Sequence, residues 1–546
     1  MPIVDILRKN AELYGNDDAL VELNYDAEAK KSWSEIELVE PARKFGFRSV
    51  ITWKQFDDIA NRFANYLISI GIKKDDKVAI LLMNCIEWLP AYFGVLKTGA
   101  WAVPLNYRIP PEEIQYSLEK SEASVLLFGE DTLDRVESIH ENLKGIRQFL
   151  YTGENKPAFA KDFSSAIIDF DTTDPMIPLT DDDFAAIYFS SGTTGLPKAI
   201  LHKHRSLSSA CVTEQKHHGQ TKDDIFLCIP PLYHTGAKMH WFGSFLVGGK
   251  GILLRGSKAE WILRAASEEK CSIVWMTVPW VQDVLCLLED PNFDRSKYDF
   301  SHWRMLHIGA QPVPPSLVHR WLKQFPTHQY DTNYGLSEST GPGCVHLGVE
   351  NINKVGAIGI PGYGWKTKIV DEDGNEVKPG EVGELCVQGP GLMTCYYHDE
   401  KATNETLRDG WLFTGDIAKT DEDGFIYLVD RKKNVIIMGG ENIYPVQIED
   451  FIMKHPAVKA VGVIGVYHER LGEIPAAIIE LKDGCACTED EMNEFCKALP
   501  RYKRPRKIIF APVPHNPTGK IEKPKLRAMY GGTRVVAKQN EISEIS

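Results

Sequence analysis

The chain lacks several features that would assign it to a specialised class of protein. Its 546 residues include 11 cysteines but no CxxC pair, so reduced thiols are expected, not a zinc ribbon or a disulfide framework. Apolar runs such as Val78–Met83 are far shorter than the roughly 20 residues of a membrane span. A basic excess is also missing, because the formal net charge is −13, and this argues against broad nucleic-acid binding.

Neither end of the sequence shows a recognisable targeting signal. The opening residues MPIVDILRKNAELYG are amphipathic and short, unlike a secretory leader. The closing residues NEISEIS are no peroxisomal signal. These features, together with the unpaired cysteines, predict a soluble cytoplasmic protein without a membrane span.

The patterning predicts an α/β protein of at least two domains. The chain is too long for one compact core, and its 43% hydrophobic and 25% charged residues are typical of a globular protein. From Lys77 to about Glu130, short apolar strands alternate with helical stretches, which indicates parallel α/β layering. From about Gly356 to Gly391, glycines and turn signals indicate an antiparallel or barrel-like element.

A basic, turn-prone break follows Asp430, and beyond it a shorter α+β pattern begins. We therefore predict a boundary near Lys432–Asn434, with one domain over residues 1–431 and a second over residues 432–546. The charged segment Asp26–Lys44 has no clear period and is interpreted as a surface insertion.

The segment with the clearest chemistry is Ser190–Lys198, directly after a predicted strand. Two glycines and four hydroxyl residues in nine positions form a flexible loop of donors that can wrap phosphate oxygens. Lys198 adds a positive charge for the same anion. The run does not have the Gly-Lys-Ser/Thr spacing of a Walker A motif, so an ordinary P-loop NTPase is disfavoured. Taken alone, the run could equally be a polar surface loop.

Seven short blocks follow one another along the chain. They are SSGTTGLPKA (190–199), PLYHTGA (231–237), IGAQP (308–312), NYGLSE (333–338), GWLFTGD (410–416), DRKKNVIIMGGENIYP (430–445) and NPTGK (516–520). In content and order they resemble the acyl-adenylate-forming superfamily, which includes acyl-CoA synthetases, peptide-synthetase adenylation domains and beetle luciferases. The resemblance covers roughly residues 50–530 and is closest to the AMP-forming acyl-CoA synthetases.

The resemblance implies both an architecture and a reaction. The expected architecture is a large N-terminal domain of layered parallel sheets plus a barrel-like β element, and a small mobile α+β C-terminal domain. The expected reaction joins a carboxylic acid to coenzyme A: ATP activates the acid to an acyl-adenylate, and the CoA thiol then takes the acyl group. Mg²⁺ is the expected metal, and a homodimer is an expectation because family members often form dimers.

The resemblance also assigns residues to the nucleotide. Glu338 resembles the carboxylate that binds Mg²⁺ beside the phosphates, a role that suits a hard oxygen ligand. Tyr334 would pack on the adenine, whose edge the backbone of 309–311 would line, and Asp416 would accept both ribose hydroxyls. The implied ATP-binding set is Ser190, Ser191, Gly192, Thr193, Thr194, Gly195, Lys198, Gly309, Ala310, Gln311, Asn333, Tyr334, Gly335, Ser337, Asp416 and Arg431.

Residues of the C-terminal blocks are implied to act in turn. Lys520 would bridge the carboxylate and the α-phosphate, where charge builds up during adenylation. Lys433 occupies the position of the hinge about which the C-terminal domain rotates between the two half-reactions. Gly439 and Gly440 would then lie close to the pantetheine arm of CoA. The basic run Arg501–Lys507 could meet the phosphates of CoA or be a solvated helix end.

The acyl pocket is the least determined part of the sequence. His234 occupies the position where many relatives place an aromatic gate, although a lone histidine is more often structural. Trp241 suggests an apolar wall, or simply core. Lys238 could bind a polar or second carboxylate group of the acid, or be a surface residue. The identity of the acid, whether medium-chain, aryl, alicyclic or dicarboxylic, is left open.

Three other functions compete with the ligase hypothesis. An amino-acid adenylation domain usually carries an aspartate in the block 233–240, where this chain has YHTGAKMH and no acid. A luciferase-type oxygenase is disfavoured by the missing peroxisomal signal. A catalytically dead binding protein is disfavoured because Lys520, Glu338 and Asp416 are all present.

Overall fold

The computed structural model describes residues 1–26, 39–40, 47–190, 196–310, 313–341, 343–354, 356–438, 441–515 and 521–531. The chain divides into two compact units. Unit 1 comprises Met1–Lys368, Cys386–Thr414 and Thr420–Tyr427, and unit 2 comprises Ile369–Leu385, Gly415–Lys419 and Leu428–Ser546. The predicted α/β fold, with a large N-terminal domain and a smaller C-terminal one, is confirmed. The predicted boundary near Lys432–Asn434 stays a prediction.

Unit 1 contains an eight-stranded sheet in the order β20-β10-β9-β5-β4-β6-β7-β8. The five pairs of neighbouring strands from β9 to β8 are parallel. Strand β10 pairs antiparallel with both β9 and β20. The strands are β4 (Lys77–Leu81), β5 (Trp101–Pro104), β6 (Val125–Gly129), β7 (Gln148–Thr152), β8 (Lys161–Asp162), β9 (Phe184–Phe189), β10 (Ala199–Lys203) and β20 (Cys395–Tyr396).

A ten-stranded sheet in the order β17-β16-β15-β14-β13-β11-β12-β1-β3-β2 completes the layered part of unit 1. The run from β15 to β1 is parallel, and both of its ends continue in antiparallel pairs. The strands are β1 (Asp18–Asn24), β2 (Val39–Glu40), β3 (Phe47–Thr52), β11 (Ile225–Cys228), β12 (Lys250–Leu254), β13 (Ile273–Thr277), β14 (Met305–Gly309), β15 (Gln329–Tyr334), β16 (Val345–His346) and β17 (Ile360–Pro361).

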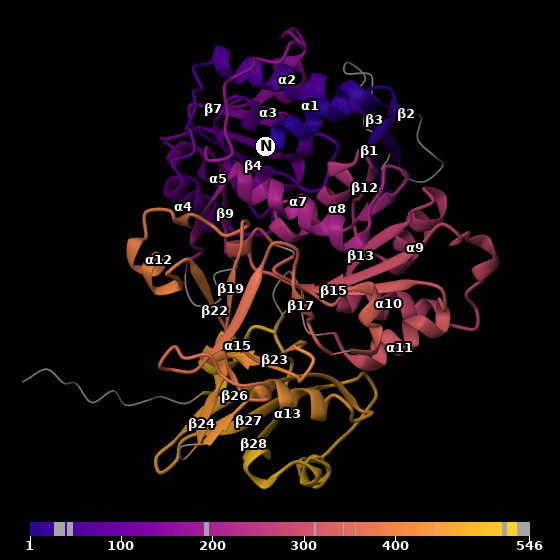
Figure 1. The fold of residues 1–546 in the computed structure, drawn as a ribbon, viewed down its shortest axis with the longest axis vertical. Helices are drawn as coiled ribbons and strands as arrows, with labels where there is room; N and C mark the ends of the chain where they lie inside the picture. The colour runs from indigo at the N-terminus through magenta and orange to yellow at the C-terminus, as the bar shows by residue number, and fades with distance from the viewer. Residues whose placement is uncertain are drawn as a thin grey trace, which may run out of the picture. The chain divides into compact units, whose positions relative to one another are not determined.

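Several parallel strands, such as β6 and β13, form where the sequence has short apolar runs, because both faces of a parallel sheet are covered by helices. Helices α9, α10 and α11 lie along β13 to β15 (Figure 1). The helices of unit 1 are α1 (Ile3–Tyr14), α2 (Trp53–Ser69), α3 (Trp88–Lys97), α4 (Pro111–Ser121), α5 (Leu133–Ile139), α6 (Phe163–Ile167), α7 (His204–His218), α8 (Thr235–Leu246), α9 (Ala259–Glu268), α10 (Val278–Leu288), α11 (Pro315–Gln324) and α12 (Glu400–Thr406).

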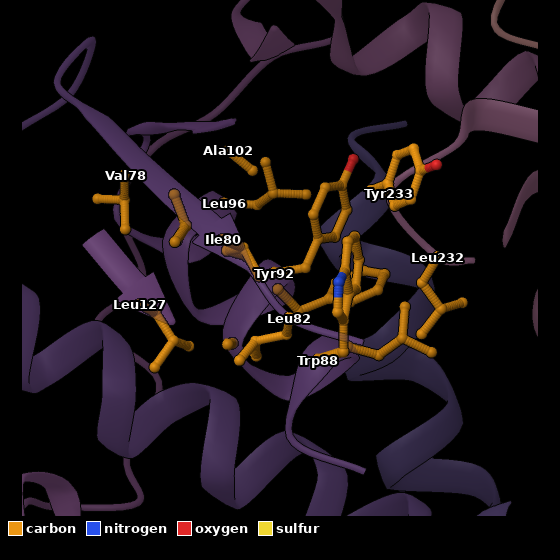
Figure 2. Packing of buried hydrophobic residues seen from close by; sticks show 14 of the residues in the cluster. Val78, Ile80, Leu82, Trp88, Tyr92, Leu96, Ala102, Leu127, Leu232 and Tyr233 are labelled. Atoms are coloured by element: carbon orange, nitrogen blue, oxygen red, sulfur yellow. The ribbon is translucent and has the colours of Figure 1, made fainter. Parts of the chain in front are cut away.

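Local signals explain where several of these helices begin. Helix α2 starts with a capping box in which the Thr52 hydroxyl accepts from the Gln55 amide and the Gln55 side chain accepts from the Thr52 amide. Every residue of α3 is buried, which fits its apolar sequence. Side chains of α3 pack with Leu232 and Tyr233 in the core of unit 1 (Figure 2).

A third sheet has the order β18-β19-β22-β21, with β23 paired to β22. This is the antiparallel or barrel-like element expected from the glycine-rich stretch. Its strands are β18 (Lys366–Val370), β19 (Gly383–Gln388), β21 (Leu407–Arg408), β22 (Trp411–Thr420) and β23 (Ile426–Arg431).

The C-terminal part of unit 2 is a five-stranded sheet in the order β25-β24-β27-β26, with β28 paired to β27. It matches the predicted α+β pattern, and α14 begins with a second capping box between Thr488 and Glu491. Its elements are β24 (Ile436–Met438), β25 (Glu441–Ile443), α13 (Pro445–Ile452), β26 (Val458–His468), β27 (Gly472–Leu481), α14 (Glu489–Phe495), β28 (Lys507–Phe510) and α15 (Lys523–Tyr530).

The structure bears on two further predictions, the missing membrane span and the surface insertion at Asp26–Lys44. Among the described residues, no helix has the length and apolar character that crossing a bilayer would require. Most of the charged segment Asp26–Lys44 lies outside the described residues. The cytoplasmic location and the homodimer stay predictions.

Candidate active site

The two ends of the phosphate-loop motif are hydrogen-bonded to each other. Ser190 follows β9 and Lys198 precedes β10, and the Ser190 amide donates to the Lys198 carbonyl at 3.0 Å. The Lys198 amide donates to the Ser190 hydroxyl, also at 3.0 Å. Because β9 and β10 form an antiparallel hairpin, these bonds close the loop at its base. The five residues between them, 191–195, lie outside the described part of the chain.

Glu338 is linked to Lys198 through Tyr396. The Tyr396 hydroxyl donates to Glu338 Oε1 at 2.8 Å, and the Lys198 ammonium lies 4.5 Å from the centre of the Tyr396 ring. Burial and the neighbouring Glu338 carboxylate raise the pKa of Tyr396, so its hydroxyl stays protonated and keeps donating. The predicted phosphate-binding lysine and metal-binding carboxylate are therefore in contact with the same tyrosine.

The turn that carries Glu338 is fixed from several sides. The His202 ring contacts the Ser337 carbonyl through Nε2 at 2.7 Å, and burial lowers the pKa of His202 to about 4, so the neutral ring donates. Gly341 has φ +99°, and a Cβ there would lie 2.7 Å from the Gly236 amide nitrogen at the start of α8. Only glycine tolerates both the conformation and the contact. The turn is thereby pressed against the N-terminus of α8.

The residues expected at the adenine lie where two parallel strands end. Gly309 is the last residue of β14, and Asn333 and Tyr334 are the last of β15. Ala310 follows with φ +71°, a left-handed conformation that turns the chain out of the sheet. The carboxyl ends of neighbouring parallel strands are the usual ligand-binding edge of an α/β sheet. Gln311 lies outside the described residues.

His234 is the residue before α8, and the loop leading to it is held by a buried asparagine. The Asn84 side chain donates to the Pro230 carbonyl at 3.0 Å and accepts from the Leu232 amide at 2.8 Å. The His234 ring packs against Tyr233, with 4.1 Å between ring centres. His234 thus lies at the α8 end that Gly341 contacts.

Lys238 is fully buried, so the surface alternative is wrong. Its ammonium donates to the carbonyls of Leu232 at 3.1 Å and His234 at 3.3 Å. It lies 4.3 Å from the centre of the Tyr188 ring, with the rings of Trp88 and Tyr92 nearby; Figure 2 shows these last two side chains, both from α3. Burial lowers the pKa of Lys238 well below its usual value. Among the described residues no carboxylate lies within ion-pair distance of it.

Trp241 lies in the core of unit 1. It is fully buried and stacks on Trp53, with ring centres 6.5 Å apart. Gly251 approaches it so closely that a Cβ there would lie 2.7 Å from the indole. These contacts account for the packing of Trp241 as a core residue, and its role in an acyl pocket stays a prediction.

The ribose and hinge residues belong to unit 2. Arg431 Nε donates to Asp416 Oδ1 at 2.8 Å, so the two residues assigned to the ribose contact each other. Lys433 lies in a short turn, where burial lowers its pKa with further contributions from Arg431 and Arg527. Arg527 Nη2 of α15 donates to the Lys433 carbonyl at 3.3 Å and to Asn434 Oδ1 at 3.0 Å. Lys520, Gly439 and Gly440 lie outside the described residues.

Sequence reasoning missed two residues of this site. Tyr396 comes from a strand almost 60 positions after Glu338, and nothing in the seven blocks pointed to it. His202 lies four residues after Lys198, beyond the phosphate-loop block, and its contact with Ser337 depends on the pairing of β10 within the sheet. The one available signal was the position of His202 directly after the apolar run Ala199–Leu201.

Comparison with known proteins gives consistent results. Residues 28–397 match the family described as AMP-binding enzyme, and residues 447–520 match the AMP-binding enzyme C-terminal domain. A long-chain-fatty-acid–CoA ligase of Mycobacterium tuberculosis is 32% identical over 486 residues, covering 88% of this chain and 94% of the relative. A 2-succinylbenzoate–CoA ligase of Bacillus cereus is 30% identical, covering 88% and 93%.

Solved structures agree. An anthranilate CoA ligase in complex with anthranoyl-AMP superposes with a TM-score of 0.84 at 26% identity, covering 97% of both chains. The o-succinylbenzoate CoA synthetase of Bacillus subtilis, in complex with its acyl-adenylate intermediate, gives a TM-score of 0.80 at 25% identity, covering 98% of this chain and 99% of that one.

Proposed function

The chain belongs to the AMP-binding enzyme family, and from this premise we propose how its residues perform the reaction of an AMP-forming acid–CoA ligase. The enzyme activates a carboxylic acid with ATP, forming an acyl-adenylate and pyrophosphate, and transfers the acyl group to the thiol of coenzyme A. The observation that carries the proposal is the joint contact of Lys198 and Glu338 with Tyr396 at the phosphate loop.

In the first half-reaction, the acid's oxygen attacks the α-phosphorus and pyrophosphate leaves. Lys198 and the donors of Ser190–Gly195 hold the phosphates, and Lys520 supplies positive charge between the two reacting anions. Asp416 and Arg431 bind the ribose. Tyr334, Gly335 and the backbone of 309–311 bind the adenine.

Glu338 suits a Mg²⁺ ligand, since it is a carboxylate whose orientation is fixed by the Tyr396 hydroxyl. When bound, the ion would neutralise part of the phosphate charge. Lys198, which contacts the same tyrosine as Glu338, would neutralise a further part of the phosphate charge.

In the second half-reaction, the C-terminal domain turns about Lys433, and Gly439 and Gly440 line the approach of the thiol. The contact of Arg527 with Lys433 and Asn434 supports a hinge here, because it joins the turn to α15 within unit 2. The small residues leave room for the pantetheine arm.

We propose an aryl-bearing acid as the substrate class. A Cβ at Gly309 would lie 3.3 Å from the Trp275 ring, and that ring stacks on His240 with 5.1 Å between centres. A flat group fits against such a pair.

A hydroxylamine-trapping screen of the pure protein tests this proposal. The acids are benzoate and cinnamate derivatives matched with octanoate and palmitate, each measured with and without CoA. We expect hydroxamate from the aryl acids and CoA-dependent thioester from the best of them. Preference for palmitate would overturn the substrate class but leave the ligase assignment intact. No activation of any acid would contradict the assignment itself.

A further inference from the structure

A group of imidazoles and carboxylates, which we call the histidine–carboxylate cluster, is buried in unit 1 beside the strand ends that carry Gly309 and Asn333. It draws on α7, α8 and strands β14 to β16, so no single motif contains it. All its members are at most 3% exposed. They are Glu214, His218, His240, His307, Asp331 and His346.

The distances around Glu214 Oε2 match those between ligands of one metal ion, and its contacts do not meet hydrogen-bond geometry. Glu214 Oε2 lies 3.2 Å from His218 Nδ1 and 3.2 Å from His240 Nδ1. None of these three atoms has a hydrogen-bond partner among the described residues, because the groups are not aligned for donation. Ligands about 2.1 Å from a tetrahedral ion lie about 3.4 Å from one another, which is close to the observed separation.

His307 supplies an independent observation. It is completely buried, and neither ring nitrogen has a hydrogen-bond partner in the described part of the chain. Its ring stands perpendicular to those of His240 and His218, at 4.3 and 4.6 Å between centres. One ligand atom each from Glu214, His240 and His307 lie within 4.8 Å of one another. An imidazole buried in this way costs free energy unless something occupies its nitrogen.

Asp331 has the position of an outer carboxylate. It lies 2.7 Å from His218 Nε2, the nitrogen opposite the one that faces Glu214, and 3.1 Å from His346 Nδ1. It also accepts from the Gly348 amide at 2.9 Å. A histidine that binds metal through one nitrogen commonly donates the other to a carboxylate, which fixes the tautomer and the ring.

The charges point the same way. Two carboxylates with no access to solvent need compensating positive charge nearby. A divalent cation among Glu214 and the imidazoles supplies it in one place and satisfies the unpaired atoms at once. Soft thiolates are absent from the cluster, and nitrogen with one carboxylate suits Zn²⁺ and its neighbours.

We propose that Glu214, His218, His240 and His307 bind one divalent transition-metal ion of the Zn²⁺ class, with Asp331 holding His218 as a positioning residue. The site is distinct from Glu338 and from the Mg²⁺ expected there. Glu214 Oε1 accepts from the Asn333 side chain at 3.3 Å, and His307 lies two residues before Gly309. The ion therefore orders the strand ends that face the adenylate, without touching it.

The test is metal binding by the intact chain and does not rest on the proposed ligase activity. Protein stripped with a chelator and returned to buffer is titrated with Zn²⁺ and, separately, with Co²⁺. We expect about one equivalent of tightly bound metal. The Co²⁺ form should show the visible bands of a tetrahedral site, without the near-ultraviolet thiolate band that the cysteines would give.

Variants identify the ligands. His307→Ala and His240→Ala should no longer bind the one equivalent of metal. Asp331→Asn should weaken the affinity for the metal about 10- to 100-fold. His328→Ala is the matched control, since His328 is also buried but its neighbours are aromatic rings; it should keep the metal. A wild type that binds none, or binding that survives His307→Ala, would overturn the site and leave a hydrogen-bonded network only.

Discussion

Two regions of unit 1 meet at the start of α8 and differ in how their residues are encoded. On the phosphate side, Ser190, Lys198 and Glu338 come from compact motifs, and the contact through Tyr396 brings them together as the motifs imply. On the side proposed for the acyl group, Lys238 and His240 come from α8 and His307 from β14, and their surroundings depend on packing. The residues predicted to bind the phosphates are encoded in contiguous motifs, whereas the contacts of Lys238, His240 and His307 depend on residues far apart in the chain.

The comparison is sharpest for charge. Lys198 is exposed directly before β10, where an anion can reach it. Lys238 is only forty residues further on but is sealed among carbonyls and three aromatic rings. The first setting suits a lysine that binds a ligand, whereas the second, in which burial lowers the pKa of Lys238, suits a lysine that serves the protein's own packing.

The largest effect is expected from removing the charge of Lys520, which is proposed to act in adenylation and not in thioester formation. Lys520→Ala should lower acid-dependent ATP–pyrophosphate exchange by about 10³-fold, because the developing charge on the α-phosphorus loses its neutralising group. The variant should still transfer a supplied acyl-adenylate to CoA at nearly the normal rate. Equal loss of both steps would contradict the assigned role of Lys520.

At the hinge we expect a somewhat smaller effect, which should fall on thioester formation and not on adenylation. Lys433→Pro should lower thioester formation from a supplied acyl-adenylate by about 10²-fold, since a misplaced domain loses the alignment of the thiol. Pyrophosphate exchange should change much less. Lys433→Ala is the control, because it removes the side chain and keeps the backbone free. An unaffected second step in the proline variant would move the hinge elsewhere.

The sequence was sufficient for the fold wherever periodicity and turn signals agreed. Between Lys77 and about Glu130 the strands and helices alternate as the apolar runs predicted, beginning with the strand Lys77–Leu81 and the helix Trp88–Lys97. Each is encoded locally, by a run whose length and flanking glycine or proline match one element. The α+β pattern after Asp430 followed for the same reason.

The site was predictable only as far as motifs extend. Glu338 could be assigned from its block, but its partner Tyr396 could not, because β20 joins the sheet through β10 and not through sequence proximity. Lys238 misled the sequence analysis for a related reason. A lysine in a helix is usually solvated, and its burial arises from α3 and β9, which precede it by many residues.

A third prediction tests the contact between Glu338 and Tyr396. Glu338→Gln should lower adenylation about 10- to 100-fold and raise the Mg²⁺ concentration needed for half-maximal rate. Tyr396→Phe should act in the same direction but only about 5-fold, because it removes one hydrogen bond worth about 1 kcal/mol. Mg²⁺ titrations of pyrophosphate exchange measure both. A normal Mg²⁺ dependence in Glu338→Gln would mean that the metal is bound elsewhere.

The smallest effect is expected for the stability of the protein when Lys238 is replaced. Lys238→Met keeps the volume and removes an amine whose pKa is lowered by burial and that has no carboxylate partner among the described residues. The free energy of unfolding should therefore change by only about 1 kcal/mol at neutral pH. Lys97→Met is the matched control. Lys97 is equally buried but lies 2.6 Å from both Asp57 and Asp174. Its removal would leave Asp57 without this cation and Asp174 with Arg8 alone, which should cost about 3–5 kcal/mol.

The pH dependence of stability gives a further test of Lys238. Because burial lowers the pKa of Lys238 in the folded state, the unfolded chain binds more protons between that lowered pKa and the usual value near 10.4. Wild-type stability should therefore rise with pH across this window relative to Lys238→Met, as measured by urea unfolding at a series of pH values. A difference between the two proteins that stays flat up to pH 10 would mean that Lys238 is charged in the folded protein, as a ligand-facing lysine would be.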